Sequence, residues 1–172
     1  MHALESWHDF FILLGTAGAT LLALLFVAVS LGAGFLSESR ADATRAFFSP
    51  VVVHFSAVFL MSILALVPGH RPIFFAAAIG VCALAGLAVA TYAMVSLLRH
   101  DWTHYKQDHV AYGLLPTIAY VALLLAAFML GNGNEYAVDI LAGALLMLLL
   151  VNVRNAWDLT LSMVHRQARR RH

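Results

Sequence analysis

The chain has 172 residues, of which 62% are hydrophobic and 11% charged, and its mean hydropathy is +0.86. A water-soluble domain of this size buries only about 70% of the surface that its unfolded chain exposes, which leaves too much apolar surface in water. The composition therefore predicts an integral membrane protein. A net charge of +1 argues against nucleic acid as a partner, and a single cysteine, Cys82, excludes a disulfide framework.

Apolar runs separated by polar or turn-forming segments predict an all-α bundle of five transmembrane helices, forming one domain over residues 1–172. The spans are expected at about 10–35, 51–67, 73–98, 113–130 and 137–153, the last continuing as an amphipathic helix to about 164. Their lengths suit a hydrocarbon core roughly 30 Å thick. The second run is the shortest and follows Pro50, a residue that the first turn of a helix accepts. If this run is re-entrant, the chain has four spans.

The basic residues predict the orientation. With five spans, Arg71 lies on one side, and the other side holds Arg40, Arg45, Arg99, Lys106, Arg166, Arg169, Arg170 and Arg171. Since positive charge favours the cytoplasmic face, we expect the N-terminus outside and residues 165–172 as a basic cytoplasmic tail.

Two stripes of small residues predict close helix–helix contacts, because small side chains let helix backbones approach in lipid. Four-residue spacing joins Gly15, Ala19 and Ala23 on the first span, and Ala78, Cys82, Gly86 and Ala90 on the third. These stripes pack either within the bundle or between subunits. Five thin helices enclose a small interior, which favours a homo-oligomer.

An inner polar layer is expected just beneath the cytoplasmic surface, at the depth where helical rise places the second and fifth spans together. Arg154 and Asp158 are four residues apart and share a helix face, where they are able to pair. The layer comprises His54, Asn152, Arg154, Asn155 and Asp158. Polar groups at membrane depth are costly, so this layer is either a neutralised structural feature or the mouth of a pathway or docking site.

An outer polar group is expected at the opposite membrane face. It comprises His8, Asp9, Arg71, Glu135 and Asp139, and Asp9 is placed to cap the first helix. The middle of every predicted span lacks a charged residue, which argues against a proton pump or an ion-coupled transporter.

Nine histidines raise the question of a metal or haem. His100 and His104 have the spacing of a helical metal pair, and His109 follows nearby, so these three form a weak candidate metal site. A b-type haem needs two histidines at matched depth on different helices, but the candidate partner of His54, His100, lies past the end of its helix. Recognised nucleophile, carboxylate-pair, phosphate-loop and dinucleotide patterns are absent from the sequence. We expect neither an enzyme nor a resident cofactor.

Several short segments resemble a group of small, uncharacterised bacterial multi-span membrane proteins, sometimes labelled as modulators of a membrane-anchored ATP-dependent protease. The segments are Trp7-His8-Asp9-Phe10-Phe11, Gly15-Thr16-Ala17-Gly18-Ala19, Leu25-Phe26-Val27-Ala28-Val29-Ser30 and Asn155-Ala156-Trp157-Asp158-Leu159. The resemblance implies a bacterial inner-membrane location and supplies no catalytic residues.

Three functions remain open from the sequence. The first is an oligomeric channel or passive permeation protein for ions or small solutes, because rings of charge at both mouths suffice for selection. The alternative is a non-conducting regulatory or accessory subunit that binds another membrane protein. A metal- or haem-binding membrane protein ranks third. Beyond the lipid bilayer, the expected partners are further copies of the chain or another membrane protein.

Overall fold

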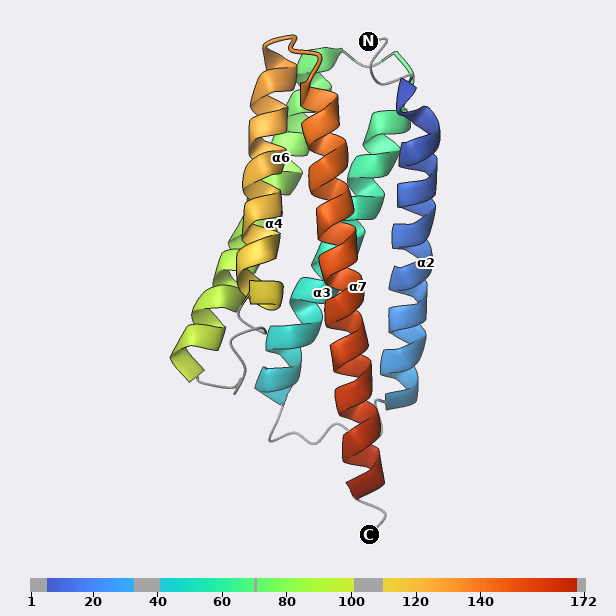
Figure 1. The fold of residues 1–172 in the computed structure, drawn as a ribbon, viewed down its shortest axis with the longest axis vertical. Helices are drawn as coiled ribbons and strands as arrows, with labels where there is room; N and C mark the ends of the chain where they lie inside the picture. The colour runs from blue at the N-terminus through green and yellow to red at the C-terminus, as the bar shows by residue number, and fades with distance from the viewer. Residues whose placement is uncertain (1–5, 33–40, 70, 101–109, 170–172) are drawn as a thin grey trace.

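The computed structural model describes residues 6–32, 41–69, 71–100 and 110–169, and side-chain surroundings for 6–28, 30, 50–69, 71–96 and 110–161. This part of the chain is helical and contains no strand. The elements in order are α2 (His8–Gly32), α3 (Ala41–Leu66), α4 (Pro72–His100), the short π-helical η3 (Val110–Leu114), α6 (Leu115–Gly131) and α7 (Ala137–Arg169). Five long helices lie side by side in one bundle (Figure 1).

Four of the helices are long and apolar enough to cross a membrane. These stretches are His8–Ala28, Pro72–Ser96, Val110–Gly131 and Ala137–Leu161, whereas the apolar part of α3, Pro50–Leu66, is shorter. Together they form an all-α bundle of the kind expected for a multi-pass membrane protein.

The second helix starts earlier than the sequence predicts. We expected Pro50 in its first turn, but α3 begins at Ala41 and contains Pro50 in its interior. Proline is tolerated inside membrane helices because neighbouring groups satisfy the backbone atoms that it leaves free. The polar segment before Pro50 therefore continues the helix from residue 41.

The other boundaries also differ in detail. The described part of the first helix runs to Gly32, and residues 33–35 of the predicted span lie outside the described residues. The last helix, α7, continues without a break to Arg169, past the predicted end near 164. The fourth helical segment starts at Val110 as η3, three residues before the predicted span. Pro116, near the start of α6, offers no amide hydrogen to the carbonyl one turn earlier, and interrupted helical ladders often widen into π turns.

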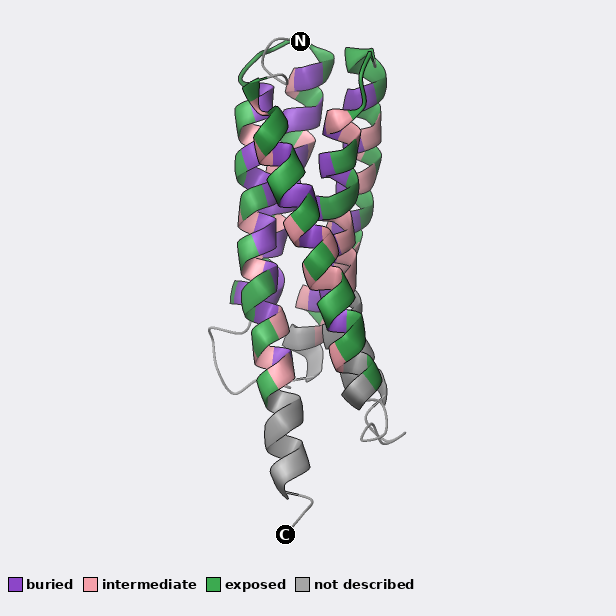
Figure 2. Cartoon of the chain, turned by 90° about the vertical axis from the view of Figure 1, so that its right-hand side faces the viewer, coloured by how far each residue is buried: buried purple, intermediate pink, exposed green. Residues whose placement is uncertain are grey.

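Packing between the helices places α3 and α7 at the centre of the arrangement. The first contacts α2, α4 and α7, and the second contacts α2, α3 and α6, while α6 packs between α4 and α7. Buried residues lie on the surfaces that the helices turn toward one another, and exposed residues cover the outside of the bundle (Figure 2). The interior is filled by aliphatic and aromatic side chains from all five long helices.

Two tight turns close the end of the bundle where α2 begins. Gly69 and Gly133 have φ of 71° and 73°, in the left-handed region that glycine adopts without a steric penalty. The first glycine lies between α3 and α4, and the second lies between α6 and α7. These turns let each following helix fold straight back along its predecessor.

Candidate functional site

The candidate site is a set of polar side chains buried inside the bundle. Among the described residues, the buried polar side chains are His54, Ser62, Asn152 and Asn155, each no more than 1% exposed. Two buried tyrosines, Tyr112 and Tyr120, bind members of this set. We call His54, Tyr112, Tyr120, Asn152 and Asn155 the buried polar cluster. It joins α3, η3, α6 and α7.

His54 of α3 pairs with Tyr120 of α6. The distance between His54 Nδ1 and Tyr120 Oη is 2.8 Å, and both side chains are buried. The tyrosine reaches this position because Gly86 of α4 has no side chain: a Cβ there would collide with the Tyr120 ring. One glycine on α4 therefore makes room for the tyrosine that meets His54.

Asn152 of α7 ties that helix to α3. Its Nδ2 donates a hydrogen bond of 2.8 Å to the backbone carbonyl of Val51. Val51 lies one turn before His54 on α3, so this bond brings Asn152 to the same level of the bundle.

Asn155 links η3 to α7 through both its side chain and its backbone. Its Nδ2 donates to the carbonyl oxygen of Ala111 at 3.0 Å, and its own carbonyl oxygen accepts a hydrogen bond of 2.9 Å from Tyr112 Oη. The carbonyls of a π turn are less regularly paired than those of an α-helix, so a side-chain donor is a fitting partner. Asn155 is thus the main polar link between the two elements.

Each asparagine and His54 keeps one buried atom without a hydrogen-bond partner among the described residues. These atoms are His54 Nε2, Asn152 Oδ1 and Asn155 Oδ1; the Ser62 hydroxyl oxygen is in the same situation further along α3. Such a buried orphan costs about 1–3 kcal/mol.

The inner polar layer predicted from the sequence divides into two parts. His54, Asn152 and Asn155 lie inside the bundle, whereas Arg154 and Asp158 lie on its surface, with side chains 43% and 38% exposed. Arg154 Nη2 and Asp158 Oδ2 are 3.6 Å apart, as the four-residue spacing predicts. This pair is not part of the buried polar cluster because both side chains are more than a third exposed on the outside of α7.

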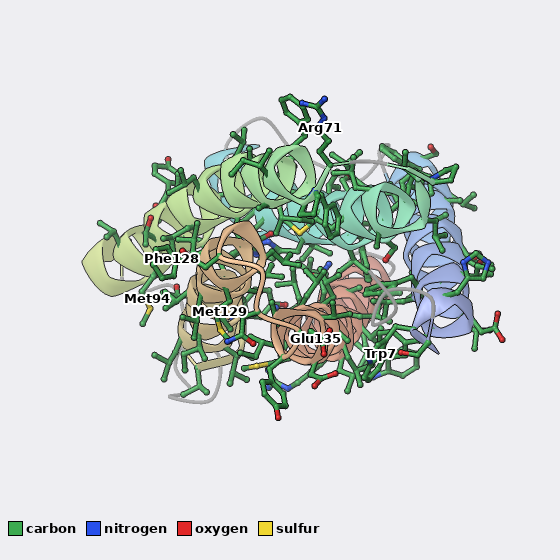
Figure 3. The ribbon with its side chains drawn as sticks, turned by 90° about the horizontal axis from the view of Figure 1, so that it is seen from above. Trp7, Arg71, Met94, Phe128, Met129 and Glu135 are labelled. Atoms are coloured by element: carbon green, nitrogen blue, oxygen red, sulfur yellow. The ribbon has the colours of Figure 1, made fainter. Side chains whose placement is uncertain are left out.

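The outer polar group is spread over separate parts of the end surface. Asp139 Oδ1 accepts a hydrogen bond of 3.1 Å from Trp7 Nε1, which joins the starts of α2 and α7. Arg71 lies at the far edge of this surface from Trp7 and Glu135 (Figure 3). His8 and Asp9 are exposed, and Asp9 lies inside the first turn of α2 rather than at the cap, because the helix begins at His8.

The small-residue stripe on α2 differs from the prediction. Gly15 packs against Ser62, and Gly18 against the backbone of Phe59, so the α2–α3 contact uses these two glycines. Ala19 is half-buried and Ala23 is exposed. The contact line follows a three-residue step at this point, whereas the predicted stripe assumed a strict four-residue step.

The stripe on α4 is partly inside the bundle. Gly86 and Ala90 are buried, whereas Ala78 and Cys82 are half-buried at its edge. The neighbouring residues Ile79 and Ala83 are fully buried instead. The axis of the contact is therefore rotated slightly from the predicted stripe.

Among the described residues, no three histidine, cysteine, aspartate or glutamate side chains are grouped so that they could hold a metal ion. His100 ends α4, but its side chain lies outside the described part, as do His104 and His109.

Sequence reasoning missed both tyrosines and Ser62. Tyr120 is surrounded by apolar residues in the sequence, and its partner glycine lies on another helix, so the sequence offers no local signal for the contact. Tyr112 has a weak signal, because it precedes Pro116 by four residues, where a helix carbonyl loses its donor.

Comparison with known proteins gives no match: no protein-family model, no curated protein and no solved structure is significantly similar to the chain.

Proposed function

We propose that the chain is a non-conducting accessory subunit of a bacterial inner membrane, which binds another membrane protein through the cytoplasmic end of α7. The observation that carries this proposal is the closed apolar interior of the bundle. Its orientation in the proposal, with the C-terminus in the cytoplasm, rests on the distribution of arginine and lysine along the sequence.

The interior beyond His54 is filled by large apolar side chains. Phe55, Val58 and Met61 of α3 are fully buried. The same holds for Leu141, Leu145 and Leu148 of α7, which packs against α3. A packed hydrocarbon layer of this kind has no donors or acceptors to replace the water around an ion or polar solute. The packed interior of a single chain therefore favours a binding function over conduction.

The element best placed to bind a partner is α7. Its 33 residues span about 50 Å at 1.5 Å rise per residue, more than a hydrocarbon core roughly 30 Å thick. In Figure 1 it extends beyond the ends of the other helices. Along its outer face, Leu150, Val153, Trp157 and Leu161 are exposed, and Trp157 is 63% exposed. Exposed apolar and aromatic residues along one helix face suit a groove in a partner.

A second candidate function is a pathway between copies of the chain. The observation that favours it is the exposed face of α2, where Thr16, Thr20 and Ala23 lie together. The Thr20 hydroxyl donates to the Thr16 carbonyl at 2.8 Å, so the oxygen of this hydroxyl keeps its acceptor capacity on the outside of the bundle. A homo-oligomer joined through α2 would place these groups along its axis.

Site-specific photo-crosslinking in cells tests the two proposals against each other. A benzophenone amino acid is placed at Trp157, at Thr20 or, as a matched control, at Leu84, which is 57% exposed on α4. The accessory-subunit proposal expects one heterologous adduct of discrete mass from position 157 and none from position 84. Proteoliposomes of the purified protein should then retain their ions.

The opposite result would replace the first proposal with the second. Adducts of twice the chain mass from position 20, together with ion or solute flux through vesicles that contain only this protein, would indicate a homo-oligomeric permeation protein. Adducts at all three positions alike would contradict a defined partner surface on α7.

A further inference from the structure

We propose that η3 and the cytoplasmic end of α7 form a coupled pair, in which each element holds the other in place. Asn155 of α7 supplies the hydrogen-bond donor that Pro116 of α6 lacks, and η3 in turn fixes the direction of α7. The inference rests on the proposed function only for the role of the neighbouring α7 surface, which carries Trp157.

The backbone of η3 has one carbonyl that its own helix leaves without a donor. In a π turn each carbonyl pairs with the amide five residues later, so the partner of the Ala111 carbonyl would be residue 116. That residue is proline, which has no amide hydrogen. Asn155 Nδ2 donates to this same carbonyl at 3.0 Å. A side chain of α7 therefore replaces the missing backbone donor.

Without that donor, little holds η3 in a helical form. Its middle residues, Ala111, Tyr112 and Gly113, are buried, and a buried carbonyl without a donor costs about 1–3 kcal/mol. An α-helical turn offers no escape, because there the amide of residue 116 would serve the Tyr112 carbonyl, and proline again has none. A single turn also gains too few hydrogen bonds to offset the cost of fixing its backbone. The formation of η3 therefore depends on α7.

The dependence runs in both directions. Tyr112 Oη of η3 donates to the backbone carbonyl of Asn155 at 2.9 Å, which gives α7 a second hydrogen bond to the turn. Gly113 lies against Met94 of α4, where a Cβ would collide with the methionine side chain, so η3 packs against both α4 and α7. Since a coupling free energy is reciprocal, whatever α7 contributes to the turn, the turn contributes to the position of α7.

The coupled pair lies beside the surface that is proposed to bind a partner. Asn155 is 1% exposed and faces the bundle, whereas Trp157, two residues later, is 63% exposed. The helix continues unbroken through both residues to Arg169, so the two side chains move together. A partner that rotates or tilts this end of α7 therefore acts on η3, and the loss of η3 releases the direction of Trp157.

A rescue experiment on the full-length protein in lipid vesicles tests the first direction. Pro116→Ala restores an amide hydrogen at residue 116, so the turn no longer needs Asn155. Asn155→Leu alone should raise deuterium exchange at residues 110–114 by about fivefold to tenfold, as expected for the loss of one hydrogen bond. In the Pro116→Ala background the same substitution should change this exchange by less than about twofold.

The matched control is the other buried asparagine of α7. Asn152→Leu removes a hydrogen bond to the Val51 carbonyl of α3, and its effect on residues 110–114 should not depend on residue 116. If Asn155→Leu does not fold, Asn155→Ala removes the same donor and takes its place. Equal effects of the Asn155 variant in the two backgrounds would overturn the assignment of Asn155 as the substitute for the proline amide.

Distances between spin labels test the second direction. In a Cys82→Ser background, labels at Leu84 of α4 and at Trp157 report the position of the α7 end. Labels at Leu84 and at Leu146, which is also exposed on α7, form the control pair before the contact with η3. We expect Asn155→Leu to broaden the 84–157 distance distribution and to leave the 84–146 distribution unchanged. An unchanged 84–157 distribution would overturn the coupling.

Neither measurement involves a partner, so the coupling and the proposed function fail separately. Exchange and distances that behave as expected, with no adduct from position 157 in cells, would remove the partner and keep the coupling. An adduct from position 157, together with an effect of Asn155→Leu that ignores residue 116, would keep the partner and remove the coupling.

Discussion

Tyr120 of α6 occupies the space beside Gly86 of α4, and a Cβ on residue 86 would overlap its ring. The fit brings the Tyr120 hydroxyl to His54, 2.8 Å from Nδ1. The contact between α4 and α6 thus places the Tyr120 hydroxyl against His54 on a third helix, α3.

The first prediction concerns this glycine. Gly86→Ala should lower the free energy of unfolding by about 1–3 kcal/mol, the usual cost of overpacking, and Gly86→Leu should lower it further. Gly143→Ala is the matched control, because a Cβ on Gly143 of α7 meets nothing within 4 Å. Unfolding in mixed detergent micelles measures both. Equal stability of the two alanine variants would show that Tyr120 does not pack on α4 in the membrane.

The second prediction concerns the His54–Tyr120 pair. A double-mutant cycle with His54→Phe and Tyr120→Phe should give a coupling of about 0.5–1.5 kcal/mol, the net value of a buried hydrogen bond. The double variant should lose less stability than the sum of the two single losses, because each single variant leaves one buried partner unpaired. A coupling near zero would mean that the two side chains do not bind each other.

The third prediction concerns the attachment of η3. Asn155→Leu removes the donor to the Ala111 carbonyl, so the amides of residues 110–114 should exchange with deuterium faster than in the parent protein. Tyr112→Phe removes the hydrogen bond to the Asn155 carbonyl and should have a smaller effect in the same direction. Thr160→Val, which alters a hydroxyl bonded to its own helix, is the control and should leave that exchange unchanged.

The fourth prediction ranks the surface pair below the buried cluster. Arg154→Leu and Asp158→Leu should each cost less than about 1 kcal/mol, because both side chains are more than a third exposed and such pairs contribute about 0.2–1 kcal/mol. Arg154→Lys and Asp158→Asn should cost less still. Asn155→Leu should exceed all four in the same unfolding assay. A larger loss from Arg154→Leu would indicate that Arg154 stabilises the fold through more than this exposed pair.

The fifth prediction concerns orientation. A fluorescent reporter that matures in the cytoplasm should be active when fused after His172 and inactive when inserted at Asn134, in the turn between α6 and α7. The reverse pattern in intact cells would invert the proposed topology. Activity at both positions would contradict α7 as a spanning helix.

The sequence predicts the number and order of the helices because apolar runs and turn residues are local signals. Pro68, Gly69 and Gly133 mark the turns, and the structure places tight turns at these residues. Helical rise converts residue number into distance, so the sequence also predicts one polar layer that contains His54, Asn152 and Asn155. The structure buries all three side chains.

The partners of these residues are not visible in the sequence, because rotation about the helix axis decides which face meets which neighbour. Tyr120 is one polar residue in an apolar run, and its inward position is explained only by contacts with other helices, those with Gly86 and His54. The same rotation separates Arg154 from Asn155, although the two residues are adjacent in the chain.

The enclosed position of α3 has a consequence for how the protein enters the membrane. Over residues 51–66, only Phe59, Leu60 and Ile63 are exposed, and the apolar part of this helix is shorter than in the other four. A single helix with a histidine and a short apolar stretch has a less favourable free energy of transfer from the translocation machinery into lipid than its neighbours have. We therefore expect α3 to be released into lipid together with α2, as a hairpin in which Gly15 and Gly18 of α2 pack against α3.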